Sequence, residues 1–495
     1  MKDKYEKVSE LMKRRGFLWP SYEMYGGVGG LLDIGPLGSP IKRRIEEEWR
    51  RFFSERVRFL EVGTPIVTPC EVFKASGHIE HFSDNMAECA SCKKRWRVDH
   101  LIREQKDLSV DGLSAKEMDK IVKEKGVKCP DCGGGLSETQ PFNLMFKTTI
   151  GPYADRVDYL RPETAQAMFT NFKRLYELAR RKLPFAAAQI GRCLRNEISP
   201  RQGPIRLREF TIMEFEFFFD PERPKCPALE NLLEEVVRLV PASRKEEKLE
   251  DPIEVSIKQA LGDGYVLTEW QAYFMLLSQK FVESLGIPFG NQRFDEKMPW
   301  EKAHYSAQTH DHEILLDRWG WTEVAGIAYR TDYDLKVHME ATKSDMRVEV
   351  DGRRIMPHVV EPSYGSDRLL YAALEYAYSE RETRVVLKLP RHIAPLQAVV
   401  LPLVSKDRLP ERAASIYETL KEKGFAVEYD DSGFIGKRYA RFDEVGVPLA
   451  ITIDYQTLDD GTVTLRDRDT WSQVRTEATK LPLLLSDFLS GKVNF

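Results

Sequence analysis

Long hydrophobic runs are missing from this 495-residue sequence, and so is an excess of either charge. No stretch approaches the roughly 18 apolar residues that a membrane-spanning helix needs, and the first residues mix both charges without an apolar segment behind them. Lys and Arg number 74 against 78 Asp and Glu, so the net charge of −4 does not mark a nucleic-acid binder. We therefore expect a cytoplasmic protein without a membrane segment, in which RNA contacts depend on local basic patches.

Repeats and a disulfide framework are also lacking. The sequence shows no internal repeat and no low-complexity tract, and its seven cysteines are an odd number. The 42% of hydrophobic residues is enough to build packed cores. The length predicts roughly two to four domains.

The pattern of the sequence changes near residue 390. Residues 1–389 are predicted to form one large domain with an insertion at about 76–150 and a second at about 220–300, the latter a subdomain or lid. Residues 390–495 interleave strand-like and helix-like stretches and are predicted to form an independent αβ domain. Near the start, Ser39 and Pro40 predict the N-cap and first turn of an amphipathic helix.

The most informative segment is a predicted hairpin of two strands, 185–197 and 206–219, joined by a polar loop. Period-two alternation gathers one set of side chains on a single face: Gln189, Gly191, Cys193, Arg195, Glu197, Arg206, Arg208, Phe210, Glu214 and Glu216. Such a face can be a layer of solvated salt bridges. Alternatively, guanidinium groups for phosphates, a carboxylate for an exocyclic amine and a ring for a base would bind a nucleoside triphosphate.

The same residues carry a resemblance to a known family. RNE and RLREF resemble motif 2 of class II aminoacyl-tRNA synthetases, VGTPIV resembles motif 1 with its dimer-interface proline, and EPSYGSDR resembles motif 3. Other segments, among them FNLMFKT, LRPETAQ, RTDYDL and IGKRYARFDEVGVP, are similar to glycyl-tRNA synthetases of the homodimeric, archaeal and eukaryotic-like type.

This resemblance implies a fold and an activity. The fold is an α+β class II catalytic domain, an antiparallel sheet flanked by helices with insertions, followed by an α/β anticodon-binding domain. The implied enzyme, a homodimer, joins glycine to the 3′ end of tRNA(Gly) through glycyl-adenylate, with ATP and Mg²⁺, and releases AMP and pyrophosphate.

The resemblance also assigns roles to residues. Arg195, Arg206 and Arg368 are the expected catalytic residues, the first at the α-phosphate and the others at the γ-phosphate. The expected ATP site comprises Arg195, Asn196, Glu197, Ile205, Arg206, Leu207, Arg208, Glu209, Phe210, Glu323, Val324, Gly365, Ser366, Asp367 and Arg368, with Glu197 on the adenine amino group, Phe210 on the ring and Glu323 at Mg²⁺. The expected glycine site comprises Arg97, Glu163, Phe210, Glu214, Arg330, Glu361, Ser363 and Gly365.

Substrate chemistry agrees with these assignments. Glycine offers only an ammonium and a carboxylate, so several carboxylates and one arginine are what a selective site can use. Alanine is rejected if the space of its methyl group is filled, so no editing domain is needed. Glycine's own carboxylate is the nucleophile, which agrees with the lack of a Ser-His-Asp or Cys-His arrangement. Arginines and Mg²⁺ position the substrates and neutralise charge.

A metal site is predicted by four cysteines in a CxxC…CxxC pattern: Cys89, Cys92, Cys129 and Cys132. This spacing can close a tetrahedral thiolate site without an open position, which predicts structural Zn²⁺. Reduced free thiols are the alternative.

Three histidines of shared strand parity could ligate a second metal, but a hydrogen-bonding or core role fits them better: His304, His310 and His312. Glu323 and Arg330 have opposite strand parity, so both face one pocket only if the strand bends, with Gly326 the expected position.

Other interpretations stay open at this level. An inert paralogue is one, because this fold is reused in non-enzymatic proteins such as a mitochondrial DNA polymerase accessory subunit. A sister synthetase for histidine, proline, threonine or serine is another. In the C-terminal part, Lys437, Arg438 and Arg441 could contact anticodon phosphates or form a solvated helix face.

Overall fold

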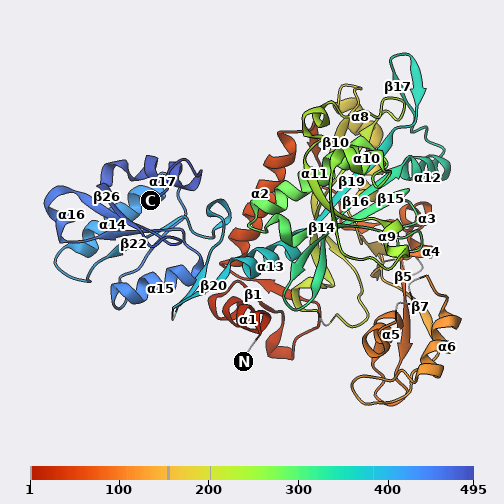
Figure 1. The fold of residues 1–495 in the computed structure, drawn as a ribbon, viewed down its shortest axis with the longest axis horizontal. Helices are drawn as coiled ribbons and strands as arrows, with labels where there is room; N and C mark the ends of the chain where they lie inside the picture. Colours follow the sequence, from red (N-terminus) through yellow and green to blue (C-terminus); the bar gives the residue numbers. More distant parts are fainter. Residues whose placement is uncertain (1–2, 109, 111, 153–155, 201, 383) are drawn as a thin grey trace.

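The structure is a computed structural model that describes residues 3–108, 110, 112–152, 156–200, 202–382 and 384–495. A large part built around one sheet is followed by a smaller C-terminal part, blue in Figure 1, and the hairpin of β20 (Tyr378–Arg381) and β21 (Arg384–Leu387) lies between them. Within the described ranges, every helix is too short or too polar to cross a bilayer.

Nine strands form the central sheet in the order β13-β12-β14-β15-β16-β19-β11-β10-β3. All neighbours are antiparallel except β12 with β14 and β10 with β3, which confirms the expected α+β class. Their bounds are β3 (Phe59–Glu61), β10 (Phe185–Leu194), β11 (Glu209–Phe219), β12 (Val236–Val240), β13 (Ile253–Ser256), β14 (Gln292–Glu296), β15 (Gln308–Leu316), β16 (Gly320–Thr331) and β19 (His358–Gly365).

Helices cover both faces of this sheet because its strands alternate apolar side chains to either side. Ala186 and Ala188 of β10 join the main core, whereas Phe185 and Ala187 join the second. The main core is closed by α2 (Gly38–Ser54), α11 (Glu269–Ser284) and α13 (Ser366–Ala377), and the second by α7 (Ala165–Thr170), α8 (Phe172–Leu178) and α12 (Tyr333–Thr342).

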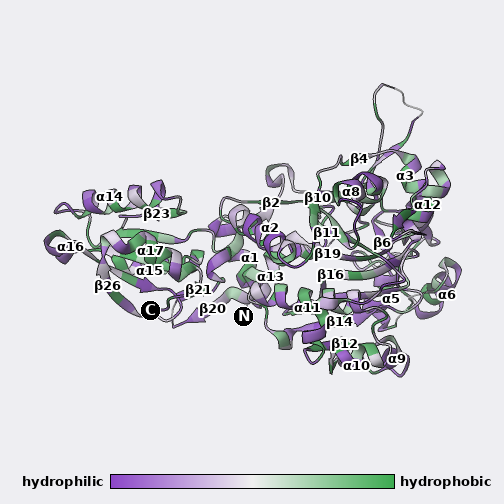
Figure 2. Ribbon diagram, turned by 90° about the horizontal axis from the view of Figure 1, so that it is seen from above, coloured by the Kyte–Doolittle hydropathy of each residue, from purple (hydrophilic) through white to green (hydrophobic). Residues whose placement is uncertain are grey.

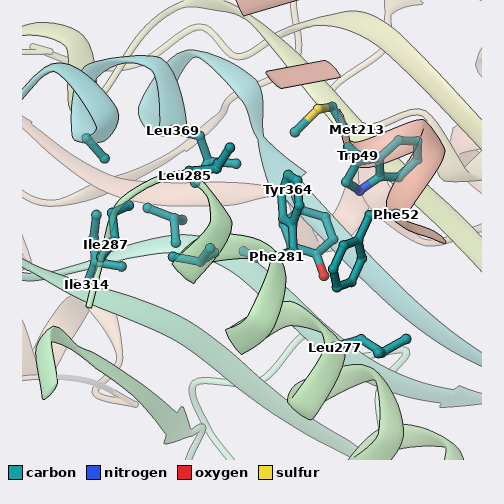
Figure 3. Packing of buried hydrophobic residues seen from close by; sticks show 14 of the residues in the cluster. Trp49, Phe52, Met213, Leu277, Phe281, Leu285, Ile287, Ile314, Tyr364 and Leu369 are labelled. Carbon is teal, nitrogen blue, oxygen red and sulfur yellow. The ribbon is translucent and has the colours of Figure 1, made fainter. Parts of the chain in front are cut away.

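Aromatic rings fill the centre of the main core (Figure 3). Trp49 of α2 lies with its ring centroid 6.4 Å from that of Tyr364 on β19, and Phe281 of α11 lies 5.6 Å from the same tyrosine. The contact fixes α2 and α11 against the strand that carries the motif 3 segment.

Helix α2 begins at Gly38, so Ser39 is not its N-cap as expected but lies in the first turn. A Cβ at position 38 would lie 2.2 Å from the carbonyl oxygen of Phe17. Only glycine permits this approach, and the helix starts two residues earlier than the Ser39-Pro40 pattern predicts.

The segment 220–300 differs from the expected second insertion. It supplies β12, β13 and β14 to the central sheet, and α10 (Ile257–Gly262) and α11 to the main core, whereas α9 (Ala242–Glu246) has no buried residue (Figure 1). Because β12 pairs in parallel with β14 across more than fifty residues of chain, no local pattern signals it. The segment is part of the body built around the central sheet and not a lid.

The insertion at 76–150 has a small core of its own, orange at the lower right of Figure 1. It contains β5 (Ser83–Glu88), β6 (Arg95–Arg97), α5 (Val98–Lys106), α6 (Ala115–Lys125) and β7 (Gln140–Asn143). The elements that connect it to the central body are β4 (Val67–Thr68), α3 (Cys70–Ala75), α4 (His78–His81), β8 (Lys147–Thr148) and β9 (Asp158–Leu160).

The C-terminal part holds a separate five-stranded sheet in the order β23-β22-β24-β25-β26. Its central strands are apolar, as Figure 2 shows, and helices pack against them. The bounds are β22 (Ala398–Pro402), α14 (Leu409–Glu422), β23 (Val427–Tyr429), α15 (Ile435–Val445), β24 (Leu449–Ile453), α16 (Tyr455–Asp460), β25 (Thr462–Asp467), β26 (Gln473–Glu477) and α17 (Leu481–Leu489).

Helix α1 (Lys4–Arg15) contacts both parts. Arg14 and Arg15 pair with Glu444 of α15, and Asp3 before the helix pairs with Arg318 between β15 and β16. The remaining strands form two peripheral hairpins, β1 (Leu18–Pro20) with β2 (Leu32–Ile34) and β17 (Val348–Val350) with β18 (Arg353–Ile355).

The position of Trp49 gives a stability prediction. Trp49→Ala should lower the free energy of unfolding of the large part by about 3–5 kcal/mol, because it leaves a cavity in a fully buried cluster. Urea unfolding followed by circular dichroism measures this. Leu178→Ala is the matched control, since Leu178 is 63% exposed and its loss should cost less than about 0.5 kcal/mol; equal effects would contradict the packing described.

Candidate functional site

Two adjoining pockets open on the central sheet. The larger, of about 880 Å³, lies between the sheet, the 76–150 insertion and the segment 297–305. The smaller, of about 100 Å³, lies between the hairpin of β10 and β11 and the start of α13. Four residues line both pockets, so the two are continuous: Arg195, Ile212, Glu323 and Ser363.

The smaller pocket is built by the predicted hairpin. Strands β10 and β11 pair with Cys193 opposite Phe210 and Gln189 opposite Glu214, so these four residues share a face as predicted. The guanidinium of Arg195 lies 5.3 Å from the ring centroid of Phe210. Arg206 lies 3.4 Å from the Glu197 carboxylate. The hairpin thus presents two guanidinium groups, a carboxylate and a ring to one pocket.

Arg368 closes the pocket from the first turn of α13. Its Nη1 donates to the Glu323 carboxylate at 2.9 Å and its Nε donates to the carbonyl of Ile205 at 2.8 Å. Burial raises the pKa of Glu323, but the Arg368 guanidinium outweighs it and lowers that pKa to about 2. Arg368 therefore ties the motif 2 loop to β16.

Most residues predicted for ATP line the smaller pocket: Arg195, Glu197, Ile205, Arg206, Leu207, Phe210, Glu323, Val324, Gly365, Asp367 and Arg368. Four others do not. Arg208 donates to the carbonyls of Glu197 and Gly29, both at 2.8 Å, Glu209 pairs with Arg192 at 2.7 Å, and Ser366 donates to Glu46 at 2.9 Å. The backbone N–H of Asn196 donates to Leu144 at 2.6 Å. These residues brace the pocket from outside.

Glutamates form the floor of the larger pocket. Glu214 accepts from the backbone N–H of Thr164 and from the Ser363 hydroxyl, both at 2.7 Å. Glu163 accepts from Gln166 at 2.9 Å and lies 3.3 Å from His78 Nε2. Of the residues predicted for glycine, Arg97, Glu163, Glu214, Glu361 and Ser363 line this pocket, whereas Phe210 and Gly365 line the smaller one.

Arg330 lies behind this floor and does not line either pocket. Its guanidinium is fully buried, donates to Asp334 at 2.7 and 2.8 Å and to Glu361 at 2.8 Å, and lies 3.6 Å from the ring centroid of Tyr305. Every side of the group is occupied, so the predicted direct contact with glycine is replaced by a role in holding Glu361.

Burial keeps part of this acidic cluster protonated near neutral pH. It raises the pKa of Glu361 to about 8, even though Arg330 acts in the opposite direction. Burial, reinforced by the charge of Glu361, also raises the pKa of Glu216 behind the floor well above its ordinary value. For Glu163, burial is outweighed by His78 and the pKa is lowered. The floor is an acidic site with room for a cation.

Strand β16 resolves the parity conflict between Glu323 and Arg330. Opposite β15, Glu313 pairs with Glu323 but the next residue, His312, pairs with Ala325. Val324 is therefore an extra residue in a β-bulge, which brings Glu323 to the same face as Gly326 and Ala328. The predicted bend exists, but it lies at Val324 and not at Gly326.

The histidines near β15 have structural roles. His310 hydrogen bonds to Gln271 at 3.2 Å and His312 to Ser278 at 2.8 Å, both inside the main body. His304 lies before the strand, and its Nε2 donates to the Ser76 carbonyl at 2.8 Å. The expected core role fits these contacts.

Asp311 and Lys297, whose side chains pair at 2.7 Å, are among the charged residues of the larger pocket that the sequence did not predict. Asp311 lies between the two buried histidines, so strand alternation alone places it on the opposite face, toward the pocket. Lys297 lies in a segment that carried no recognised pattern.

The four cysteines converge in the insertion. The sulfurs of Cys89 and Cys132 lie 3.5 Å apart and those of Cys92 and Cys129 3.6 Å apart, and all four lie within 4.8 Å of one another. Sulfurs bound at 2.3 Å to one tetrahedral zinc would be about 3.8 Å apart. The arrangement therefore fits such an ion.

Comparisons with known proteins agree with this geometry. Residues 397–487 match the family described as Anticodon binding domain. The chain is similar to the glycine–tRNA ligase of Aeropyrum pernix, with 46% identity over 98% of this chain and 97% of that protein. It is similar to that of Pyrococcus furiosus, with 42% identity over 99% of this chain and 100% of that protein.

A solved structure shares the fold. Prolyl-tRNA synthetase from Cryptosporidium parvum, complexed with halofuginone and AMPPNP, aligns with a TM-score of 0.60 over 99% of this chain and 78% of that chain. At 14% identity this likeness concerns the fold alone.

The buried position of Arg330 gives a pH-dependent prediction. Arg330→Met should lower the free energy of unfolding by about 3–5 kcal/mol at pH 8, because it leaves Glu361 and Asp334 without their counter-charge. In the variant the pKa of Glu361, already raised by burial, rises further above its unfolded value, so the loss should shrink as pH falls toward 5. Denaturant unfolding at both pH values measures it. Arg181→Met, at a pair whose arginine side chain is 71% exposed, is the control; a pH-independent loss would refute the electrostatic explanation.

Proposed function

This chain belongs to the glycine–tRNA ligases, class II aminoacyl-tRNA synthetases that join glycine to tRNA with ATP, and we propose that its two pockets divide the first reaction between them. ATP binds with its adenine in the smaller pocket, and glycine binds on the glutamate floor of the larger. One observation carries this proposal: Arg195 lies where the two pockets meet, next to Glu323 and Ser363.

In the smaller pocket, the hairpin recognises the nucleotide. Phe210 stacks on the adenine and Glu197 accepts from its amino group, while Arg206 and Arg368 contact the γ-phosphate. Arg206 and Arg368 hold carboxylates in the structure, and a phosphate would take the place of those carboxylates. Both guanidinium groups are thus held ready for an anion.

In the larger pocket, Glu163, Glu214 and Glu361 surround the ammonium of glycine. Arg330 and Gln166 hold two of these glutamates, so the carboxylates stay in place when the pocket is empty. Binding of the ammonium favours the ionised form of Glu361 and releases its proton.

In the chemical step, a carboxylate oxygen of glycine attacks the α-phosphorus, and the bond from phosphorus to the pyrophosphate oxygen breaks. Arg195 stabilises the charge that develops on the α-phosphate oxygens. Glu323 and Asp311 are hard oxygen ligands on one pocket wall and would hold Mg²⁺, which neutralises the leaving phosphates. The tRNA 3′-terminal hydroxyl then attacks the carbonyl of the glycyl-adenylate and releases AMP.

The C-terminal domain is proposed to bind the anticodon of tRNA(Gly). Of the three basic residues of α15, Arg438 is buried and donates to backbone carbonyls, and Arg441 pairs with Asp430. Lys437 is exposed, and the neighbouring Phe434 is an aromatic side chain that is 78% exposed. Lys437 for a phosphate and Phe434 for a base are the groups we assign to the anticodon.

A homodimer is proposed from the surface near the N-terminus. Tyr22, Met24 and Tyr25 are 62%, 89% and 84% exposed, and the edge strand β3 leads to Ile66 and Val67, which are also exposed. Such an apolar region beside an open sheet edge fits a second copy of the chain. No disulfide joins any of the seven cysteines, all of which lie in described residues, and this supports a cytoplasmic location.

Two experiments test these assignments. Arg195→Ala should lower ATP–pyrophosphate exchange with glycine about 100- to 1,000-fold, because it removes a charge aimed at the transition state. Exchange is measured with each of the twenty amino acids in turn, and Arg181→Ala on the surface is the control. Exchange with another amino acid would indicate a sister synthetase, and absence of exchange with and without tRNA would indicate an inert paralogue.

The cysteine cluster is tested by elemental analysis. The purified protein should hold about one zinc per chain, and Cys89→Ser should lose it, because a serine hydroxyl does not replace a thiolate ligand. Cys70→Ser, at a cysteine outside the cluster, should keep the metal. Zinc-free protein of full thermal stability would favour the free-thiol alternative.

A further inference from the structure

The larger pocket is much larger than glycine, so glycine can contact only part of its lining. A cavity of about 880 Å³ is in the range that encloses a drug-sized molecule, whereas glycine has no side chain. The proposed glycine and ATP contacts account for the floor and for the side shared with the smaller pocket. The outer walls, formed by the 76–150 insertion and by the segment 297–305, have no ligand assigned to them.

One outer wall displays a large aromatic side chain. Trp300 lines the cavity and is 56% exposed, although tryptophan is normally buried to a large extent. On one side it packs against Gly112 of the insertion, where a Cβ would lie 3.1 Å from the Trp300 Cγ. The remainder of the indole is open.

The turn that carries Trp300 is well braced. The Glu301 carboxylate accepts from the backbone N–H of Met298 at 2.9 Å and lies 3.4 Å from Lys245. Lys302 donates to the Ala307 carbonyl at 2.7 Å. These contacts hold the turn in place, so the indole is presented to the cavity from a braced segment, as a stacking surface requires.

The second reaction brings a matching ligand to this cavity. The tRNA 3′-hydroxyl has to reach the carbonyl of the adenylate, so the single-stranded end of the RNA must enter through the outer walls. Unpaired bases bind proteins mainly by stacking on aromatic rings. We propose that Trp300 stacks on the 3′-terminal base of the tRNA and positions its ribose for transfer of the glycyl group. This inference rests on the proposed function.

Alternatively, Trp300 could have a purely structural role, in which its packing against Gly112 holds the 76–150 insertion against the central body. We call this the latch role. The two roles make different demands on the side chain. A latch needs an apolar group of sufficient size, which leucine supplies, whereas stacking needs a ring, which only phenylalanine retains. The variants Trp300→Leu and Trp300→Phe therefore separate them.

The test compares the two half-reactions. Trp300→Leu should lower aminoacylation at limiting tRNA about tenfold, the order of effect expected from loss of one stacked base, and Trp300→Phe should recover most of it. ATP–pyrophosphate exchange, which needs no tRNA, should fall less than twofold in both. Equal losses in Leu and Phe variants, or a parallel fall of exchange, would overturn the stacking role.

A binding cycle identifies the contacted base. The wild-type protein should bind a tRNA that lacks its terminal nucleotide more weakly than intact tRNA, and Trp300→Leu should show little of this difference. The same difference in both proteins would place the terminal base elsewhere and overturn the proposal. Absence of glycine-dependent exchange in the wild-type protein would instead refute the proposed function, so the two failures are distinguishable.

Discussion

The site depends on one buried positive charge that balances an acidic interior. Arg330 has no solvent contact and joins β16 to α12 through Asp334 and to β19 through Glu361. A single guanidinium does not neutralise the surrounding carboxylates, and burial holds some of them in the protonated form. The interior is thus short of positive charge, and this is why we propose it as the site for the ammonium of a small amino acid, which needs no side chain to supply that charge.

The local sequence pattern was sufficient to predict the hairpin of β10 and β11, because the alternation of side chains and the residues of the turn are properties of adjacent positions in the chain. The faces predicted for Gln189, Cys193, Phe210 and Glu214 are those that the register gives. The segment 220–300 could not be placed in this way. Its strands pair with distant partners, and α11 is buried on nearly every side, so it has no polar face by which a surface helix is recognised.

For the candidate site, too, the sequence predicts some features and not others. Resemblance supplied the arginines and glutamates, but it did not distinguish residues that line the pockets from residues that hold those side chains in place, as Arg330 and Arg208 do. Asp311 lies on the face of β15 opposite the buried histidines, and Lys297 lies in a segment without a recognisable pattern, so neither was predicted for the pocket. Only the fold shows that Trp300, distant in sequence from each motif, stands in the wall of the same cavity.

The bulge at Val324 has a consequence for how this protein can change over time. Because the extra residue sets which side chains of β16 face inward, losing or gaining one residue between Glu323 and Arg330 would turn one of them away from the site. Substitutions along the strand change one side chain each, whereas a change of length exchanges the two faces. During evolution, substitutions in this strand should therefore be tolerated far more often than insertions or deletions.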